Sequence, residues 1–248
     1  MGYHQLKLTP SDSEKSTIVT PNGLFQWTVL PMGLTNCSQK FVKTITKVLN
    51  VSKEVALVYL DDVIVFGKDF KEHLRNLIMV LTLLYNANIK VHCDKSQLFQ
   101  PSVSFLGHKI SQAGLECAED KIMAVQNYPI PKSPKECMKV MGFFGYLRKF
   151  CKDFGIIAKP IYELTTKTNK SFYWTEEADK AMQTLKNRLT SPPVLTIPQP
   201  DDTFTLTIDA SKTGIGAILQ VKREEILQPV AFASYALKNN RCHIQQQN

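Results

Sequence analysis

The interpretation of this sequence depends on one stretch, Val55-Ala56-Leu57-Val58-Tyr59-Leu60-Asp61-Asp62-Val63-Ile64-Val65-Phe66. Two apolar runs rich in β-branched residues are separated only by Asp61 and Asp62, which predicts a buried hairpin with two carboxylates at its tip. Adjacent carboxylates between apolar strands are unfavourable unless solvent or a cation compensates their charge. The pair alone leaves two interpretations open, a solvated turn and a metal site.

Helices and strands are both predicted around this hairpin, so the fold class is α+β. Helical spacing of apolar residues is found over 36–49, 69–86, 133–150 and 175–189. The first three helices are predicted to begin with capping boxes at Asn36, Asp69 and Ser133. The fourth helix is predicted to be capped by Thr175. Alternating or β-branched runs predict further strands at 25–29, 89–91, 103–110, 204–208, 217–221 and 230–233, with a turn at 214–216.

Composition limits the class of protein. The chain has 248 residues, of which 44% are hydrophobic and 21% charged, with six cysteines, values that exclude disordered, collagen-like and disulfide-scaffold proteins. Without a long apolar run or a signal-like start, an intracellular protein with no membrane partner is expected. No C-x-x-C motif is present, so reduced and mostly buried thiols are expected.

Positive charge is concentrated in the middle of the sequence. Residues 121–190 hold 13 basic and 6 acidic side chains, whereas the whole chain has a net charge of +8. Arg148, Lys149 and Lys152 stand among aromatic residues, a mixture that suits a nucleic-acid backbone. The alternative is a solvated helix face.

Several motifs together resemble the reverse transcriptases of gypsy-type LTR retrotransposons and related retroviruses. Tyr59-Leu60-Asp61-Asp62 is preceded by Gly2-Tyr3-His4-Gln5 and by Leu30-Pro31-Met32-Gly33-Leu34-Thr35-Asn36. The primer-grip hairpin of that family is similar to Phe105-Leu106-Gly107-His108, and its thumb helix is similar to residues 142–150. The first strand of a linked ribonuclease H is similar to Thr207-Ile208-Asp209-Ala210-Ser211. Order and spacing agree over nearly all of the chain.

The resemblance implies a domain order. Residues 1–118 would form part of the fingers and palm, 119–168 the thumb, 169–200 a connection helix and linker, and 201–248 the start of a ribonuclease H-like domain. It also implies RNA and DNA primer–template and deoxynucleotides as partners.

The resemblance further implies a polymerase that uses two Mg²⁺ ions, with Mn²⁺ as an alternative, held by three carboxylates. Asp61 would be a direct metal ligand and Asp62 a second one, and Asp209 would belong to the nuclease. The expected nucleotide-binding residues are Tyr3, Met32 and Gly33, with core packing as the alternative role of Tyr3. Primer–template contacts are expected from Leu106, Gly107, Arg148, Lys149 and Lys152.

The sequence also predicts a catalytically incomplete protein. The family's third polymerase carboxylate would lie before Met1, and the next ribonuclease H carboxylate after Asn248. We therefore expect weak or absent ion binding, no polymerase or nuclease activity of the isolated chain, and an open sheet edge that a partner chain could complete. Two rival hypotheses are a non-catalytic nucleic-acid-binding remnant and an intact polyprotein with a misplaced start.

Overall fold

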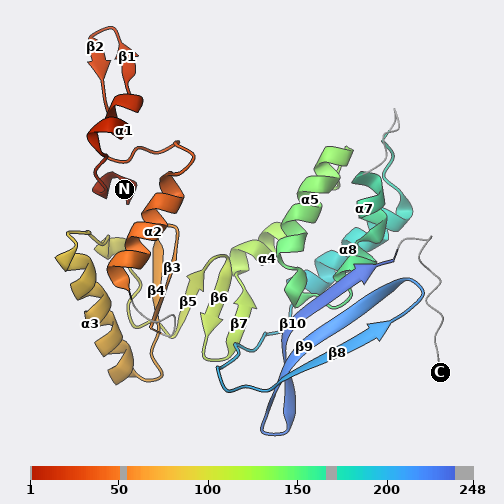
Figure 1. Ribbon diagram of the computed structural model, residues 1–248. Coiled ribbons are helices and arrows are strands. Elements are labelled where there is room, and N and C mark those ends of the chain that lie inside the picture. The colour runs from red at the N-terminus through yellow and green to blue at the C-terminus, as the bar shows by residue number, and fades with distance from the viewer. Residues whose placement is uncertain (1, 51–54, 166–171, 238–248) are drawn as a thin grey trace. The chain divides into compact units, whose positions relative to one another are not determined.

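The computed structural model describes residues 2–50, 55–165 and 172–237 (Figure 1). Contacts divide the chain into two compact units, residues 1–98 and 99–248. Both units combine helices with antiparallel sheets, which confirms the predicted α+β class.

Unit 1 contains two β-hairpins and two long helices around a small core. Its elements are η1 (Tyr3–Gln5), α1 (Pro10–Lys15), β1 (Ile18–Thr20), β2 (Gly23–Phe25), α2 (Cys37–Leu49), β3 (Ala56–Tyr59), β4 (Asp62–Val65), α3 (Phe70–Asn86) and η2 (Cys93–Lys95). The apolar stripe of α2 is buried at Phe41, Ile45 and Leu49, where it packs with Val80 and Leu84 of α3. Helical spacing predicted both helices correctly.

The β3–β4 hairpin is confirmed, but it is buried on one face only. Val58 and Val63 are paired partners that pack on the core shared by α2 and α3, whereas Leu57 and Tyr59 are 39% and 49% exposed. The predicted burial therefore holds for one face of the hairpin, because the helices cover one side of this two-stranded sheet.

Neither of two predicted strands forms as a whole. Phe25 ends β2 and Val29 forms an isolated bridge with Lys7, and at other positions side chains satisfy the backbone groups. In 25–29, the Trp27 N–H donates to Ser16 Oγ at 3.0 Å and its carbonyl accepts from Ser13 Oγ at 2.6 Å. In 89–91, the Lys90 N–H donates to Gln5 Oε1 at 2.6 Å, and Gln5 Nε2 donates back to the Lys90 carbonyl at 3.1 Å. Hydrogen bonds to side chains distant in sequence thus replace those of a strand ladder at these positions.

The helix starts were predicted with mixed success. Oxygens of Asp69, Ser133 and Thr175 each accept the backbone N–H three residues later, at 2.8, 3.3 and 3.2 Å. Asn36 precedes α2 but its side chain forms no capping hydrogen bond, so the capping box predicted there was wrong.

Unit 2 begins with a three-stranded meander, continues with helices and ends with a second antiparallel sheet (Figure 1). Its elements are β5 (Ser102–Phe105), β6 (His108–Ser111), β7 (Gly114–Cys117), α4 (Glu119–Gln126), α5 (Pro134–Tyr146), η3 (Arg148–Phe150), α6 (Phe154–Ile157), α7 (Lys159–Thr165), α8 (Glu176–Thr190), β8 (Phe204–Ala210), β9 (Gly214–Arg223) and β10 (Ile226–Ala236). The predicted strand 103–110 is split by a turn at Leu106 and Gly107. The helix predicted to run toward Phe150 ends at Tyr146.

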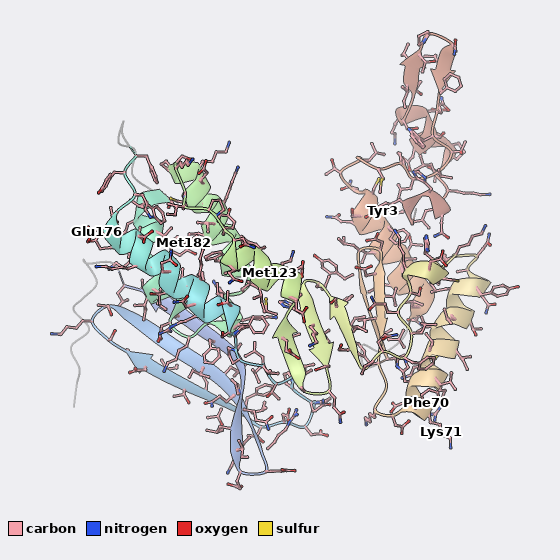
Figure 2. The ribbon with its side chains drawn as sticks, turned by 180° about the vertical axis from the view of Figure 1, so that it is seen from behind. Tyr3, Phe70, Lys71, Met123, Glu176 and Met182 are labelled. Carbon is pink, nitrogen blue, oxygen red and sulfur yellow. The ribbon has the colours of Figure 1, made fainter. Side chains whose placement is uncertain are left out.

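The main core of unit 2 lies between its helices. Val125 of α4, Phe144 of α5, Ile161 of α7 and Met182 of α8 are all fully buried, and Met182 is labelled among the other side chains of α8 in Figure 2. The apolar periodicity of α8, which predicted this buried face, is confirmed.

The second sheet has the order β10-β9-β8. The predicted turn at 214–216 is part of β9, so that prediction was wrong. The chain instead turns over 211–213, where Ser211 Oγ accepts the N–H groups of Thr213 and Gly214, each at 3.2 Å. A serine one residue after a strand thus fixes the turn through its own side chain.

A linker joins the two sheets of unit 2. Leu195 exchanges two backbone hydrogen bonds with Leu115 of β7, at 2.7 and 2.9 Å, and Thr196 donates to the Pro229 carbonyl in β10 at 2.7 Å. The meander and the second sheet are therefore tied together through backbone bonds.

Two composition-based expectations concern thiols and membranes. Among the described cysteines all are free thiols; Cys37, Cys117, Cys137 and Cys151 are buried, as predicted, and Cys93 is exposed. Cys242 lies outside the described residues. Within the described ranges, none of the helices combines the length and apolar character required to cross a bilayer.

Candidate functional site

The two aspartates of the β3–β4 hairpin lie at its tip. Tyr59 pairs with Asp62, which leaves Leu60 and Asp61 as the two turn residues. Leu60 has φ +52°, a left-handed conformation that is uncommon for a residue with a side chain. Asp61 and Asp62 are both exposed, so their charges are solvated and remain accessible to a cation without large desolvation.

The donor set at this tip fits one magnesium ion better than two. Mg²⁺ is commonly held by one or two carboxylates together with substrate phosphates, which Asp61 and Asp62 could provide jointly with a nucleotide. Over the part of the chain that the structure describes, no group of three or more histidine, cysteine, aspartate or glutamate side chains could hold a metal ion. A two-ion clamp therefore does not fit the described residues.

Tyr3 lies beside α2 and makes the packing contacts expected of its alternative role (Figure 2). Its ring meets Phe41 edge-on, with centroids 5.2 Å apart, and its hydroxyl lies 3.2 Å from Ser38 Oγ. These contacts fix the ring at the edge of the unit 1 core, where it is half-buried.

Met32 and Gly33 lie in the loop before α2. Met32 is 58% exposed. Gly33 has φ +94°, and a Cβ built on it would meet no atom within 4 Å, so its backbone conformation rather than crowding favours glycine. The loop is closed onto the helix by Cys37, whose thiol donates to the Pro31 carbonyl at 2.8 Å.

Leu106 and Gly107 form the tight turn between β5 and β6. Phe105 and His108 are paired, and the two residues between them have φ of +51° and +67°. Positive φ at both central positions is typical of the turn that matches the twist of a two-residue hairpin. The predicted primer-contact residues are therefore adjacent at one hairpin tip in unit 2.

The contact between His108 and Tyr146 beside this turn was not predicted from the sequence. Their rings are stacked, 5.1 Å apart with an interplanar angle of 5°, and Tyr146 Oη lies 3.0 Å from His108 Nε2. The hydroxyl also bonds the Leu106 carbonyl. The two residues are 38 positions apart, so no local pattern could have paired them.

Electrostatics around His108 favour its neutral form. Burial, with a smaller contribution from the positive charge of Lys149, lowers the pKa of His108 to about 4. Burial also lowers the pKa of Lys149 and raises the pKa of the Cys117 thiol to about 11. The region behind the turn therefore disfavours ionisation of all three side chains.

The basic residues predicted to contact phosphates differ in exposure. Arg148 and Lys152 are exposed, whereas Lys149 is half-buried with its Nζ 5.3 Å from the centre of the Phe150 ring. Arg188 lies beside these residues: its guanidinium donates to the Lys152 carbonyl at 2.7 Å and forms an ion pair with Asp153 at 3.9 Å.

Asp209, the predicted nuclease carboxylate, lies near the end of β8 in unit 2. It pairs with Gly216 of β9 and is exposed. β8 is an edge of the β10-β9-β8 sheet among the described residues.

Comparison with known families identifies both parts of the chain. Residues 1–110 match a family model described as reverse transcriptase (RNA-dependent DNA polymerase), and residues 174–248 match one described as an RNase H-like domain found in reverse transcriptase.

Known proteins of the same kind align along most of the chain. It is 34% identical to the retrovirus-related Pol polyprotein from transposon 412 of Drosophila melanogaster, over 95% of this chain and 19% of that protein. For the Pol polyprotein from transposon gypsy of the same organism, the identity is 34% over 96% of this chain and 24% of that protein. The chain thus spans about a fifth to a quarter of these relatives.

Solved structures give the same assignment. A foamy viral protease–reverse transcriptase in complex with double-stranded DNA matches with a TM-score of 0.88 and 25% identity, over 98% of this chain and 42% of the other. A second structure of that viral protein with double-stranded DNA matches with a TM-score of 0.83 and 25% identity, over 96% of this chain and 49% of the other. The chain therefore consists of a reverse transcriptase region followed by a ribonuclease H-like region that match those of retrotransposon Pol polyproteins.

Proposed function

We propose that this chain is a primer–template-binding part of a retroelement Pol protein and carries two of the polymerase carboxylates. The observation that carries the proposal is the exposed Asp61-Asp62 pair at the hairpin tip, within the region that matches the reverse transcriptase family. In this proposal residues 1–118 act as fingers and palm, 119–168 as thumb, 169–200 as connection and 201–248 as the beginning of the ribonuclease H-like domain.

The proposed nucleotide site lies in unit 1. Asp61, with Asp62 beside it, would hold Mg²⁺ or Mn²⁺ together with the phosphates of a deoxynucleotide. Met32 and the backbone at Gly33 are exposed for contact with the nucleotide. Tyr3 would contribute through its ring, whose edge-on contact with Phe41 fixes its orientation.

The proposed primer–template contacts belong to unit 2. The Leu106–Gly107 turn would contact the primer terminus. Arg148 and Lys152 would contact phosphates directly because they are exposed, and Lys149 would contribute mainly through its charge because it is half-buried. The structural relatives are bound to double-stranded DNA, which supports duplex nucleic acid as the ligand.

We further propose that the 248-residue chain alone does not extend a primer. Two carboxylates of unit 1 can hold one ion with a nucleotide, but clamping both the attacking and the leaving oxygen needs a second ion. The test is a primer-extension assay with the purified chain and either Mg²⁺ or Mn²⁺. Incorporation that is abolished by Asp61→Asn would overturn this part of the proposal.

Binding without catalysis is the second candidate function, and the exposed Arg148 and Lys152 favour it. The test is fluorescence anisotropy of a labelled primer–template over a series of salt concentrations. Each phosphate contact contributes about 0.9 to the slope of log affinity against log salt, so replacing Arg148 and Lys152 by alanine should reduce the slope by about 2.

A matched control removes the same charge elsewhere in unit 2. Lys180 of α8 is exposed, and Lys222 is paired with Glu225 at 2.6 Å, so their joint replacement by alanine should leave the slope within about 0.5 of the wild-type value. Equal slope changes in the two double variants would mean that net charge, rather than the thumb surface, attracts the nucleic acid. A wild-type chain without salt-dependent binding would overturn the proposed function.

A further inference from the structure

The turn proposed to contact the primer terminus has an unfavourable backbone conformation at one of its two residues. Gly107 adopts φ +67° at little cost, but Leu106 adopts φ +51° although it has a side chain. A Cβ on Gly107 would lie 3.1 Å from Tyr146 Oη. A contact from outside the hairpin that favours this conformation offsets the cost at Leu106, and Tyr146 of α5 lies against the turn.

Tyr146 supplies that contact through hydrogen bonds of a defined direction. A carbonyl can only accept, so the single hydroxyl proton of Tyr146 is donated to the Leu106 carbonyl. The hydroxyl oxygen must then accept from His108 Nε2, 3.0 Å away. This direction fixes the tautomer of His108, which carries its proton on Nε2 and a lone pair on Nδ1.

The surroundings of His108 maintain this arrangement. Nδ1 is buried and has no hydrogen-bond partner among the described residues, so a proton added there would be an unsatisfied donor. The ring stacks on Tyr146 and also meets Phe150, with centroids 5.6 Å apart. The pKa of about 4 agrees with this geometry.

We propose that His108 and Tyr146 are positioning residues that hold the Leu106–Gly107 turn in the conformation that receives the primer 3′ terminus. The inference rests on the proposed function, because it takes the primer contact of this turn as given. Tyr146 is the last residue of α5, so the same two side chains connect the thumb helix to the turn. Displacement of the C-terminal end of α5 would then be transmitted to the bound terminus.

The chain offers a matched pair of substitutions. Glutamine places an amide nitrogen near the position of His108 Nε2, whereas asparagine places it near Nδ1. His108→Gln can therefore still donate to Tyr146 Oη, and His108→Asn cannot. Tyr146→Phe retains the ring and removes only the hydroxyl. Tyr162→Phe in α7 is a control, because that exposed ring is in the same unit and outside the proposed site.

The experiment uses the 248-residue chain with two primer–templates. One carries 2-aminopurine as the 3′-terminal primer base, and the other carries it well upstream in the duplex. The upstream base reports duplex binding, and the terminal base reports contact at the primer end. For His108→Asn and Tyr146→Phe we expect the equilibrium between contacted and free primer ends in the bound complex to shift about tenfold toward the free end, equivalent to one lost hydrogen bond. This shift lowers the signal of the terminal probe at saturation, while the affinity that the upstream probe reports changes about twofold or less. His108→Gln and Tyr162→Phe should behave as wild type with both probes.

The outcomes separate this inference from the function on which it rests. If neither probe responds to the wild-type chain, the proposed binding function fails. If the upstream probe responds but the terminal probe does not, the proposed role of the turn fails, and the positioning role with it. If both respond and His108→Asn equals His108→Gln, the positioning role is wrong. Urea denaturation of each variant accompanies the test, and an equal loss of both probe signals together with lost stability would also reject a specific positioning role.

Discussion

The side-chain amide of Asn76 donates a hydrogen bond of 2.8 Å to the backbone carbonyl of Phe66. Phe66 directly follows β4, and its own N–H donates to the Val55 carbonyl at 2.8 Å. Asn76 is the buried polar residue of α3, with 8% of its surface exposed. One side chain thus ties α3 to the strand that carries Asp62.

Replacing Asn76 by alanine should destabilise unit 1. The Phe66 carbonyl would lose its partner in a partly buried position, which costs about 1–3 kcal/mol of unfolding free energy. The measurement is urea denaturation followed by the fluorescence of Trp27, in a Trp174→Phe background that leaves one tryptophan per chain. Asn86→Ala at the exposed end of the same helix is the control, with an expected change within about 0.5 kcal/mol. Equal effects of both substitutions would contradict the role given to Asn76.

The starts of α2 and α3 should respond differently to alanine. Asp69 Oδ1 accepts the Glu72 N–H at 2.8 Å, whereas Asn36 makes no capping bond with its side chain. Asp69→Ala should therefore lower the free energy of unfolding by about 1 kcal/mol in the same denaturation assay. Asn36→Ala should lower it clearly less. A larger loss for Asn36→Ala would show that the sequence-based capping box is present in solution after all.

Stability of unit 2 should fall in mild acid because of His108. Its pKa is about 4 in the folded chain and about 6.5 in the unfolded chain. The unfolded state therefore binds the proton first, and the contribution of neutral His108 is complete above pH 6.5 and is lost as the pH falls toward 4. After discounting for partial solvent exposure, the contribution is about 1–3 kcal/mol.

The check on this prediction is denaturation at several pH values between 7.5 and 4.5, followed by Trp174 fluorescence in wild type and in His108→Gln. The difference in unfolding free energy between wild type and His108→Gln should shrink or reverse as the pH falls, since glutamine does not titrate. Lys149 and Tyr146 are the ionisable side chains that act on or contact the imidazole among the described residues, and neither has an ordinary pKa within this window. A difference that is independent of pH would refute the assignment.

Two glycines of unit 2 should respond to alanine with opposite signs. Gly142 lies inside α5 with no atom within 4 Å of a built Cβ, whereas a Cβ on Gly155 would lie 2.7 Å from the Ser234 carbonyl oxygen. Gly142→Ala should stabilise unit 2 by about 1 kcal/mol through helix propensity, and Gly155→Ala should destabilise it by about 1–3 kcal/mol through crowding. Thermal unfolding followed by circular dichroism measures both. A loss of stability in Gly142→Ala would contradict the open surroundings of this helix face.

Local signals predicted the elements well wherever neighbouring residues decide the structure. The stripe of Phe41, Ile45 and Leu49 defined α2, and the cap at Thr175 with the apolar face of α8 defined the longest helix of unit 2. The Asp61-Asp62 tip followed from two β-branched runs with nothing but the turn between them. Strands were less predictable, because Trp27 and Lys90 use side chains distant in sequence to satisfy their backbone groups.

By itself, the sequence determined the two carboxylates at a hairpin tip, the basic segment 121–190 and the order of motifs that assigns the chain to reverse transcriptase and ribonuclease H-like regions. These features depend on residue identity and short spacing, which the sequence states directly. Only the tertiary structure decided that Lys149 is half-buried, that β3 and β4 are covered on one face, and that His108 and Tyr146 meet across 38 residues. The physical reason is that burial and long-range hydrogen bonds depend on which elements pack together, and no local pattern encodes that choice.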